Sequence, residues 1–269
     1  MVADAIGVEH DKFGGRPRIV SLVPSITELL FALGLGAHVV GRTPFCIHPK
    51  NQVGEIPCVG GTKTLNTGKI MALAPTHILL NIDENKQNLY EKLAETKSRI
   101  IVTHPTKVED NLELYDLLAH VFSCERNAET LKAQLVSRLK KLRRLSQSHP
   151  SLSVLYLIWK KPWMTISKDT YIASMLSLIN MRTLCVGSDS RYPSITDSVF
   201  AKLKPNVCML SSEPFPFKQK HIEEVNNILP SSQKTILVNG EMLSWYGNRA
   251  IAGLDYLENL ASRISEVNN

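Results

Sequence analysis

Three kinds of segment are missing from this 269-residue sequence. No apolar run is long enough to span a membrane. The first residues carry charges at Asp4, Glu9, Asp11 and Lys12 and hold no apolar core of signal-peptide length. The five cysteines form no CxxC pair, which argues against a disulfide framework and favours a reducing compartment. We therefore expect a cytoplasmic protein if the chain is complete, and a periplasmic one if a leader has been removed.

The signatures of hydrolysis and of nucleic-acid binding are also missing. We find no nucleophile elbow, no HExxH and no Ser-His-Asp order. The segment 60–64 resembles a phosphate loop but contains no Gly-Lys pair. The net charge of +6 is modest, and no basic stripe carries interleaved aromatics, so no nucleic-acid partner is expected. Cys46 and His48 stand alone as a C-x-H pair, which is too little to predict a metal site.

The longest helical pattern covers residues 127–144. Leu131, Leu135 and Leu139 recur at helical spacing, and Asn127 is the predicted N-cap. Strand-and-helix alternation lies on both sides of this pattern, and the chain is longer than one core usually carries. We predict an α/β fold with two lobes, each with a mostly parallel sheet, joined by one long helix. The predicted divisions are an N-terminal extension at 1–17, a first lobe at 18–122, a linking helix at 123–148 and a second lobe at 149–269.

In the first half, a short strand at 18–22 runs into a helix. Ser25 and Glu28 have the spacing of a capping box, which predicts that the helix starts at Ser25. Its first amides, near Pro24 and Ser25, would then point beyond the carboxyl end of the strand, where open α/β sheets bind ligands. An ordinary capped helix explains Ser25 equally well. Further predicted elements are strands at 39–41, 77–81 and 99–103, a tight turn at 60–64 and a helix at 111–122, and Phe45 lies in a loop bracketed by prolines.

The pattern restarts in the second half, with strands at 153–159 and 234–238 and helices at 169–180 and 250–264. A polar loop at 187–193 and a second loop at 240–248 lie between elements. The run Leu203 to Ser211 repeats the form of Leu73 to Asn81: Leu, one residue, Pro, one residue, then a strand. We interpret this as a weak internal repeat of two related lobes, although two unrelated βα units could share it by chance.

Tryptophan is scarce, and all three tryptophans lie at predicted strand ends or in loops. These positions of Trp159, Trp163 and Trp245 favour contact with a flat apolar ligand or a partner surface. For Trp159, the alternative of a buried last residue of its strand is equally open. Glutamates also follow strands, at Glu84, Glu213 and Glu241, where they could bind a basic group or cap the next helix.

Several segments together resemble a known superfamily. RIVSLVPSITELLFALGLGAHVVGRT, then PxVGGTKT, ALAPTHILLN and YLIWKKPWMTISKDTYIASMLSLIN, are similar to the helical-backbone metal receptors. These are the cobalamin and iron-siderophore substrate-binding proteins of ABC importers, with the class III periplasmic-binding-protein fold. The resemblance implies two α/β lobes joined by one long rigid helix, with the ligand in a cleft between them. SSEPFPFKxKH and GEMLSWYG resemble a leaderless subgroup, which bears on the importer role.

The resemblance also implies roles for single residues. By position, Phe45, Trp159 and Trp163 correspond to aromatics that hold the ligand, and Glu28 corresponds to a surface glutamate that docks onto the permease. The full set of candidate ligand-binding residues is Pro24, Ser25, Phe45, Cys46, Gly61, Glu84, Trp159, Trp163, Arg191, Tyr192, Glu213, Phe215, Glu241, Trp245 and Tyr246.

The leading hypothesis is a non-catalytic binding protein for a metal chelate: cobalamin or another corrinoid, with an iron chelate as the other ligand class. No catalytic cofactor and no protein-bound metal are expected, and an ABC permease is the expected partner if the protein is exported. One alternative is an enzyme on a chelatase-like two-lobed scaffold that acts on a tetrapyrrole or a related small molecule, with Glu84, Glu213 and Glu241 as acid–base candidates. Another is a regulatory protein whose cleft binds a protein partner, because the fold alone does not decide function.

Overall fold

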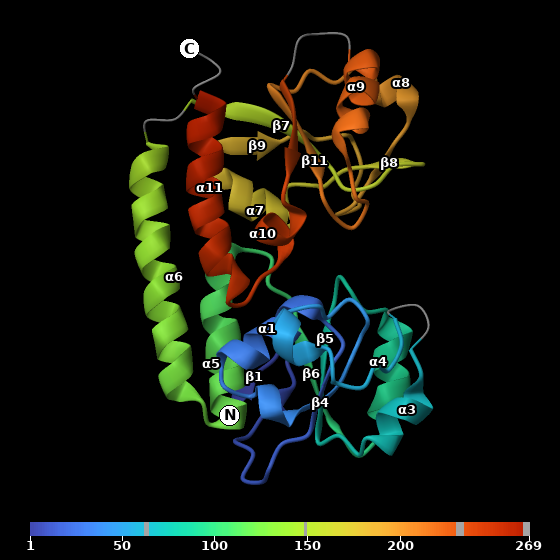
Figure 1. Cartoon of the computed structure of the whole chain (residues 1–269), viewed down its shortest axis with the longest axis vertical. Coiled ribbons are helices and arrows are strands. Elements are labelled where there is room, and N and C mark those ends of the chain that lie inside the picture. Colours follow the sequence, from blue (N-terminus) through green and yellow to red (C-terminus); the bar gives the residue numbers. More distant parts are fainter. Residues whose placement is uncertain (62–64, 148–149, 230–233, 266–269) are drawn as a thin grey trace. The chain divides into compact units, whose positions relative to one another are not determined.

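The structure, a computed structural model, describes residues 1–61, 65–147, 150–229 and 234–265. Its contacts divide the chain into two compact units (Figure 1). Unit 1 contains residues 1–105, 109–135 and 246–249, and unit 2 contains 106–108, 136–245 and 250–269. The predicted tight turn at 60–64 falls mostly on residues 62–64, which lie outside the described ranges.

Unit 1 is built on a four-stranded parallel sheet of order β4-β3-β5-β6. The strands are β3 (Ile19–Ser21), β4 (Val39–Arg42), β5 (His77–Asn81) and β6 (Arg99–Thr103). Four strands were predicted here and all four are confirmed. β5 is buried at every position, the burial expected of an inner strand of a parallel sheet that helices cover on both faces.

The helices of unit 1 are α1 (Pro24–Ala32), α2 (Lys50–Val53), α3 (Thr67–Ala72), α4 (Gln87–Ala94) and α5 (Asn111–Phe122). On one face of the sheet, Ile70 of α3 and Leu89 and Leu93 of α4 pack against Val20 and Ile78. Two short 3-10 turns, Gly36–His38 and Val108–Asp110, complete the connections. The predicted helix at 111–122 is confirmed with both of its ends.

The start of α1 differs from its prediction. The N-cap is Val23, Pro24 occupies the first turn, and Ser25 makes no capping hydrogen bond because it already lies inside the helix. The capping-box interpretation of Ser25 and Glu28 is therefore wrong. Proline fits the first helical position because the N–H that it lacks would have no partner there.

The first residues of the chain are packed onto unit 1. Val2–Ala3 (β1) pairs antiparallel with Glu9–His10 (β2). The buried carboxylate of Asp4 accepts from the backbone N–H of Val102 at 3.0 Å and lies 3.1 Å from the His10 ring. Ala5 donates to the carbonyl of Val102 at 2.9 Å, so this segment covers the edge strand β6.

Unit 2 has a second four-stranded parallel sheet, of order β12-β11-β7-β9. Its strands are β7 (Leu152–Leu157), β9 (Met181–Thr183), β11 (Val207–Ser211) and β12 (Lys234–Val238). Two short strands, β8 (Trp163–Met164) and β10 (Ser194–Ile195), pair antiparallel beside it. The predicted strand at 153–159 is confirmed but ends at Leu157, and 234–238 is confirmed with both ends.

The two sheets have the same strand order. Numbered along the chain within each unit, the strands lie in the order 2-1-3-4 in unit 1, and reading the sheet of unit 2 from its other edge gives 2-1-3-4 again. β5 and β11, the strands of the Leu-x-Pro repeat, are both the third strand of their sheet. This shared topology supports the interpretation of two related lobes over chance similarity.

The long predicted helix is confirmed as α6 (Glu125–Ser146). It begins two residues before Asn127, whose side chain donates instead to the carbonyl of Leu33 at 2.7 Å, so the predicted N-cap is wrong. In unit 2 the second half of α6 runs beside α11 (Arg249–Ser265), as Figure 1 shows. Arg138 pairs with Asp255 and Lys141 with Glu258 across these helices.

The remaining helices of unit 2 are α7 (Tyr171–Ser177), α8 (Asp197–Phe200), α9 (Gln219–Ile228) and α10 (Gly240–Ser244). α7 is shorter than predicted at both ends, and Thr170 caps its start through the N–H of Ala173. The prediction of a loop at 240–248 is wrong for its first five residues, which form α10. The side chain of Asn239 accepts from Met242 N–H and starts this turn.

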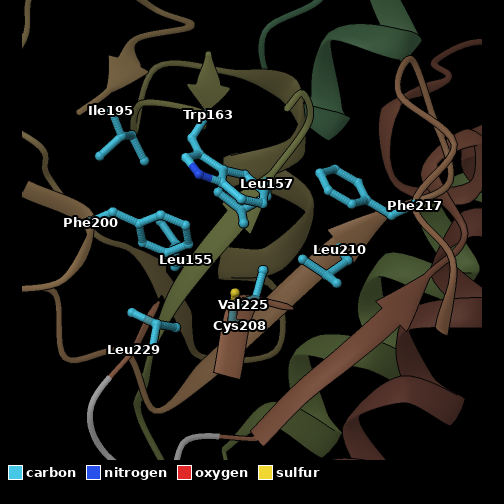
Figure 2. Packing of buried hydrophobic residues seen from close by; sticks show 10 residues of the cluster. All are labelled: Leu155, Leu157, Trp163, Ile195, Phe200, Cys208, Leu210, Phe217, Val225 and Leu229. Carbon is cyan, nitrogen blue, oxygen red and sulfur yellow. The ribbon is translucent and has the colours of Figure 1, made fainter. Parts of the chain in front are cut away.

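One face of the sheet in unit 2 carries an aromatic-rich core. Leu155, Leu157 and Leu210 from β7 and β11 meet Trp163, Phe200 and Phe217 (Figure 2). The Trp163 and Phe217 rings stack with their planes 4° apart. Trp163 is thus a core residue.

Candidate functional site

The carboxyl ends of the parallel strands define the candidate site in each unit. Because all four strands of a sheet run the same way, the segments that follow them emerge at one edge. Open α/β sheets bind their ligands at this edge. The side chains that follow β4, β5, β7 and β11 therefore decide what the protein can bind.

In unit 1, three large apolar side chains at this edge are exposed. Phe45 and Ile47 lie in the loop after β4 and expose 55% and 44% of their surface, and Ile82 directly follows β5 and exposes 44%. Most apolar side chains of this size are buried in a folded domain. Exposure of three of them after the two strands that flank β3 indicates a surface that another molecule covers.

Cys46, between the two exposed residues, points into the protein. Its sulfur lies 3.0 Å from the Thr27 hydroxyl and 3.3 Å from the Thr43 hydroxyl, and the residue is fully buried. Burial raises the pKa of the Cys46 thiol, more than these hydroxyl contacts lower it. The structure thus places Cys46 as an internal anchor of the loop and leaves Phe45 and Ile47 as its outward contacts.

The other candidates of unit 1 lie around the start of α1 and after β5. Ser25 is buried and Pro24 half-buried at the first turn of α1, and Gly61 is half-buried next to the residues that the structure does not describe. Glu84, three residues after β5, accepts from the hydroxyl of Tyr246 at 3.0 Å. Tyr246 is buried, and burial, followed by the charge of Glu84, raises its pKa well above the usual value.

Tyr246 belongs to a short segment, 246–249, that is held by unit 1. Gly247 accepts from the Tyr115 hydroxyl at 2.9 Å and donates its N–H to Asn111 at 2.6 Å. The Arg249 guanidinium binds the Glu28 carboxylate through two hydrogen bonds of 2.7 Å each. Glu28, the predicted docking residue, exposes only 16% of its side chain and is engaged in this pair.

In unit 2 the exposed aromatic is Trp159, two residues after β7. It exposes 39% of its surface and contacts Phe215 edge to face, with the ring centroids 5.7 Å apart. Phe215 follows β11 and donates its N–H to the carbonyl of Ile158, which fixes the two aromatics together. Of the two tryptophans predicted after β7, only Trp159 is available to a ligand, since Trp163 is buried in the core.

Glu213 anchors the segment that presents Phe215. Its carboxylate oxygen accepts from Trp245 Nε1 at 2.8 Å and from the Ser244 hydroxyl at 2.7 Å. Trp245 itself exposes only 8% of its surface. Glu213 and Trp245, both candidates for ligand contact, are therefore engaged with each other, and Glu241 lies half-buried in the first turn of α10.

The last two candidates lie in the loop at 187–193 of unit 2. Arg191 donates to the carbonyl of Asp169 at 3.0 Å, and its guanidinium carbon lies 5.9 Å from the centre of the Tyr192 ring. Both side chains are half-buried. Arg191 holds this loop against the segment that precedes α7.

A comparison with known protein families shows to which family this chain belongs. The family of periplasmic binding proteins matches residues 19–235, most of the chain. This chain is a periplasmic binding protein by family. The superfamily expected from the sequence resemblance and the two-lobed α/β fold are confirmed.

Individual relatives and structures agree with this membership. A vitamin B12-binding protein of Photorhabdus laumondii is 24% identical over 202 residues, covering 75% of this chain and 73% of the relative. The crystal structure of the periplasmic vitamin B12-binding protein BtuF of Vibrio cholerae has a TM-score of 0.79 at 20% identity and covers 93% of this chain and 98% of that one. The apo haem-binding protein RhuT of Roseiflexus has a TM-score of 0.78 at 18% identity, with 93% and 99% covered. These structures share the fold.

Within the described ranges, no three His, Cys, Asp or Glu side chains come together in a way that could hold a metal ion. Across the same part of the chain, no helix combines the length and the apolar character needed to cross a bilayer. A groove of about 470 Å³ lies in unit 1 between the N-terminal segment and α5, and its lining contains none of the candidate residues.

Sequence reasoning missed three residues of the site. Ile47 and Ile82 look like ordinary buried residues, because isoleucine usually lies in the core. Arg42, at the end of β4, looks like a surface charge, yet its guanidinium donates to four backbone carbonyls. No local pattern could have revealed Ile47, because Phe45, Cys46 and Ile47 are all apolar and lie outside any strand.

Proposed function

We propose that this protein is a non-catalytic binding protein for cobalamin or another corrinoid. The observation that carries the proposal is an exposed aromatic side chain after a strand of each sheet, Phe45 in unit 1 and Trp159 in unit 2. Large aromatic side chains in a binding site contact flat apolar surfaces with little loss of conformational entropy. Each unit contributes one such residue.

The ligand chemistry favours a corrinoid over haem. Haem proteins usually supply an axial His, Met, Cys or Tyr to the iron. The exposed residues Phe45, Ile47, Ile82 and Trp159 offer no such donor, and a haem iron would have to reach the half-buried His48 or Tyr192. A corrinoid can carry its own axial ligands, so an apolar surface is sufficient to hold it. The vitamin B12-binding name of the Photorhabdus relative supports the same class.

The carboxylates of the site support a binding role over an enzymatic one. Glu84 accepts from Tyr246, and Glu213 accepts from Trp245 and Ser244. These bonds hold the segments that surround the exposed aromatics. The proposal therefore assigns Glu84 and Glu213 to positioning, with no acid–base step. Delivery to an ABC permease stays a prediction, and docking through Glu28 would require its pair with Arg249 to open.

Isothermal titration calorimetry with cyanocobalamin, haemin and a ferric hydroxamate siderophore tests the proposal. We expect saturable binding of cyanocobalamin, weakened about thirtyfold in Trp159→Ala, since truncation of an aromatic anchor costs roughly 2 kcal/mol. Val199→Ala is the control, because Val199 exposes 38% of its surface, like Trp159, but belongs to α8 and not to the segments that directly follow β7 and β11. Its affinity should equal that of the wild type.

Each other outcome contradicts the proposal in a distinct way. Binding of haemin or the siderophore alone would replace the corrinoid with an iron chelate. Equal losses in Trp159→Ala and Val199→Ala would remove Trp159 from the site. Absence of heat with all three ligands would overturn the chelate-binding function itself.

A further inference from the structure

Arg42 closes the base of the loop that carries the exposed residues of unit 1. Its backbone N–H donates to the carbonyl of Pro57 at 3.0 Å, and its carbonyl accepts from Val59 N–H at 2.9 Å. The intervening residues 43–56 contain only one short helix, α2. The loop therefore leaves the sheet at Arg42 and returns beside it, in the manner of a compact surface loop whose ends lie close together.

The Arg42 side chain fills this loop from within. Nε donates to the carbonyl of Val53 at 2.8 Å, and the two terminal nitrogens donate to the carbonyls of Thr43 and Gly54 at 3.1 and 3.3 Å. A fourth hydrogen bond, of 3.4 Å, reaches the carbonyl of Cys46. The guanidinium thus joins the beginning, the middle and the end of one loop.

A second anchor lies beside the first. The Cys46 thiol is held by Thr27 and Thr43, and Cys46 N–H donates to the carbonyl of Thr43. With the carbonyl of Cys46 bound to Arg42 and its side chain buried, the neighbouring side chains at 45 and 47 are directed outward. Two inward contacts of residue 46 therefore decide the exposure of Phe45 and Ile47.

We propose that Arg42 is a positioning residue for the ligand: it preorganises the loop so that Phe45 and Ile47 stand outward before the ligand arrives. The identity of the ligand in this inference rests on the proposed function, whereas the ordering of the loop is independent of it. A loop that is ordered in advance loses less conformational entropy when the ligand binds, so the ligand binds more tightly.

Arginine suits this role, and lysine does not. A guanidinium presents five N–H donors in a planar fork, so it can serve several carbonyls in different directions. A lysine ammonium is a point charge with three donors at one atom and cannot reach Val53, Cys46 and Gly54 together. Arg42→Lys therefore keeps the charge and removes the clamp.

Arg18→Lys is the matched control in the same unit. Arg18 also donates to backbone carbonyls, those of Leu73 and Ala74, at 2.6 to 3.2 Å. It lies at the beginning of β3, the opposite end of the sheet from the candidate site. Arg18→Lys should loosen its own turn and leave ligand affinity as in the wild type.

The first measurement needs no ligand. Hydrogen exchange and iodoacetamide labelling, read by mass spectrometry, compare wild type, Arg42→Lys and Arg18→Lys. We expect Arg42→Lys alone to speed exchange across residues 43–56 and to expose Cys46 to the reagent. Exchange in β5 should stay slow, which shows that unit 1 remains folded. Unchanged exchange in 43–56 and continued protection of Cys46 would overturn the clamp.

The second measurement tests whether the order of the loop affects ligand affinity, by a double-mutant cycle with Phe45→Ala. We expect Arg42→Lys to weaken cyanocobalamin binding about tenfold, the scale of one lost contact. Phe45→Ala should then weaken binding far less in the Arg42→Lys background than in the wild type, because the loop no longer holds residue 45 outward. A loosened loop with unchanged affinity, or fully additive losses, would overturn the positioning role.

The two proposals fail separately. If the wild type binds none of the three chelates, the proposed function is overturned, and the exchange data still decide whether Arg42 orders the loop. If the wild type binds a chelate and Arg42→Lys does not change the loop, only the present inference is overturned.

Discussion

Trp245 donates its indole N–H to Glu213 across 2.8 Å, and this pair joins the end of α10 to the loop that carries Phe215. A parallel pair exists in unit 1, where the next residue, Tyr246, donates to Glu84. Glu213 and Glu84 both follow the third strand of their sheets. Two consecutive aromatic residues are thus each bound by a glutamate of their own unit, and both glutamates hold structure in place.

We expect Trp245→Phe to destabilise unit 2 by about 1–3 kcal/mol, because a partly buried carboxylate loses a donor. Glu213→Gln should cost less, since its amide oxygen can still accept from Trp245 and Ser244. Urea unfolding followed by hydrogen exchange in β11 measures both. Equal stability of Trp245→Phe and wild type would show that the hydrogen bond contributes nothing.

The two tryptophans after β7 should respond to truncation in opposite ways. Trp163→Ala leaves a cavity against Phe200 and Phe217 and should lower the free energy of unfolding of unit 2 by about 3–5 kcal/mol. Trp159→Ala, at an exposed position, should change the free energy of unfolding by less than about 1 kcal/mol and should weaken ligand binding. Urea titrations and calorimetry on both variants separate the effects. A large stability loss in Trp159→Ala would assign it to the core.

The sheets and long helices could be predicted from local sequence. β6, β12 and α5 were predicted with both ends, because apolar runs and helical spacing carry enough information over five to twelve residues. α10 was missed because its five residues are too few for a periodic pattern and begin with glycine. The Leu-x-Pro repeat predicted a relationship that the common strand order supports.

The site was harder to predict, because exposure is decided by residues far apart in the chain. Cys46 and Phe45 are neighbours, and the contacts of Cys46 with the distant Thr27, with Thr43 and with the Arg42 clamp decide which one faces outward. Trp159 and Trp163 stand on either side of one turn, and Phe200 and Phe217 draw only the second into the core. Sequence position could name these residues but could not choose between them.

Stability of unit 1 should depend on pH through His77, which is fully buried. Burial, followed by the charge of Arg99, lowers the pKa of His77 to about 4. An exposed histidine has a pKa near 6.5, so the unfolded chain takes up a proton at a higher pH than the folded one. The stabilisation is complete above about pH 6.5 and is lost progressively toward pH 4, on the order of 3 kcal/mol in total.

His77→Phe is the variant that tests this dependence. The ring lies among the aromatic side chains of Phe13 and Phe122, at centroid distances of 4.8 Å each, so phenylalanine keeps the packing and removes the titration. Unfolding free energies measured from pH 7 to pH 4 should fall more steeply in the wild type. If the free energy of unfolding falls equally with pH in both proteins, His77 does not contribute to the pH dependence of stability.

Gly247 has a positive φ and close neighbours, whereas Gly187 has a positive φ and open space around it. Both have a positive φ, +75° and +72°, but a Cβ at Gly247 would lie 3.1 Å from Leu29 Cβ and 3.3 Å from the Ser25 carbonyl, whereas none would meet an atom within 4 Å at Gly187. Gly187→Ala should therefore cost only the backbone strain, about 1 kcal/mol. Gly247→Ala should cost about 2–4 kcal/mol, because the segment must also move away from α1 and stretch its bonds to Tyr115 and Asn111. Urea unfolding of both variants, followed by exchange in the sheet of the unit concerned, measures the difference. Equal losses at the two positions would mean that segment 246–249 is held by its backbone conformation alone, and that its contacts with α1 contribute nothing to the stability of unit 1.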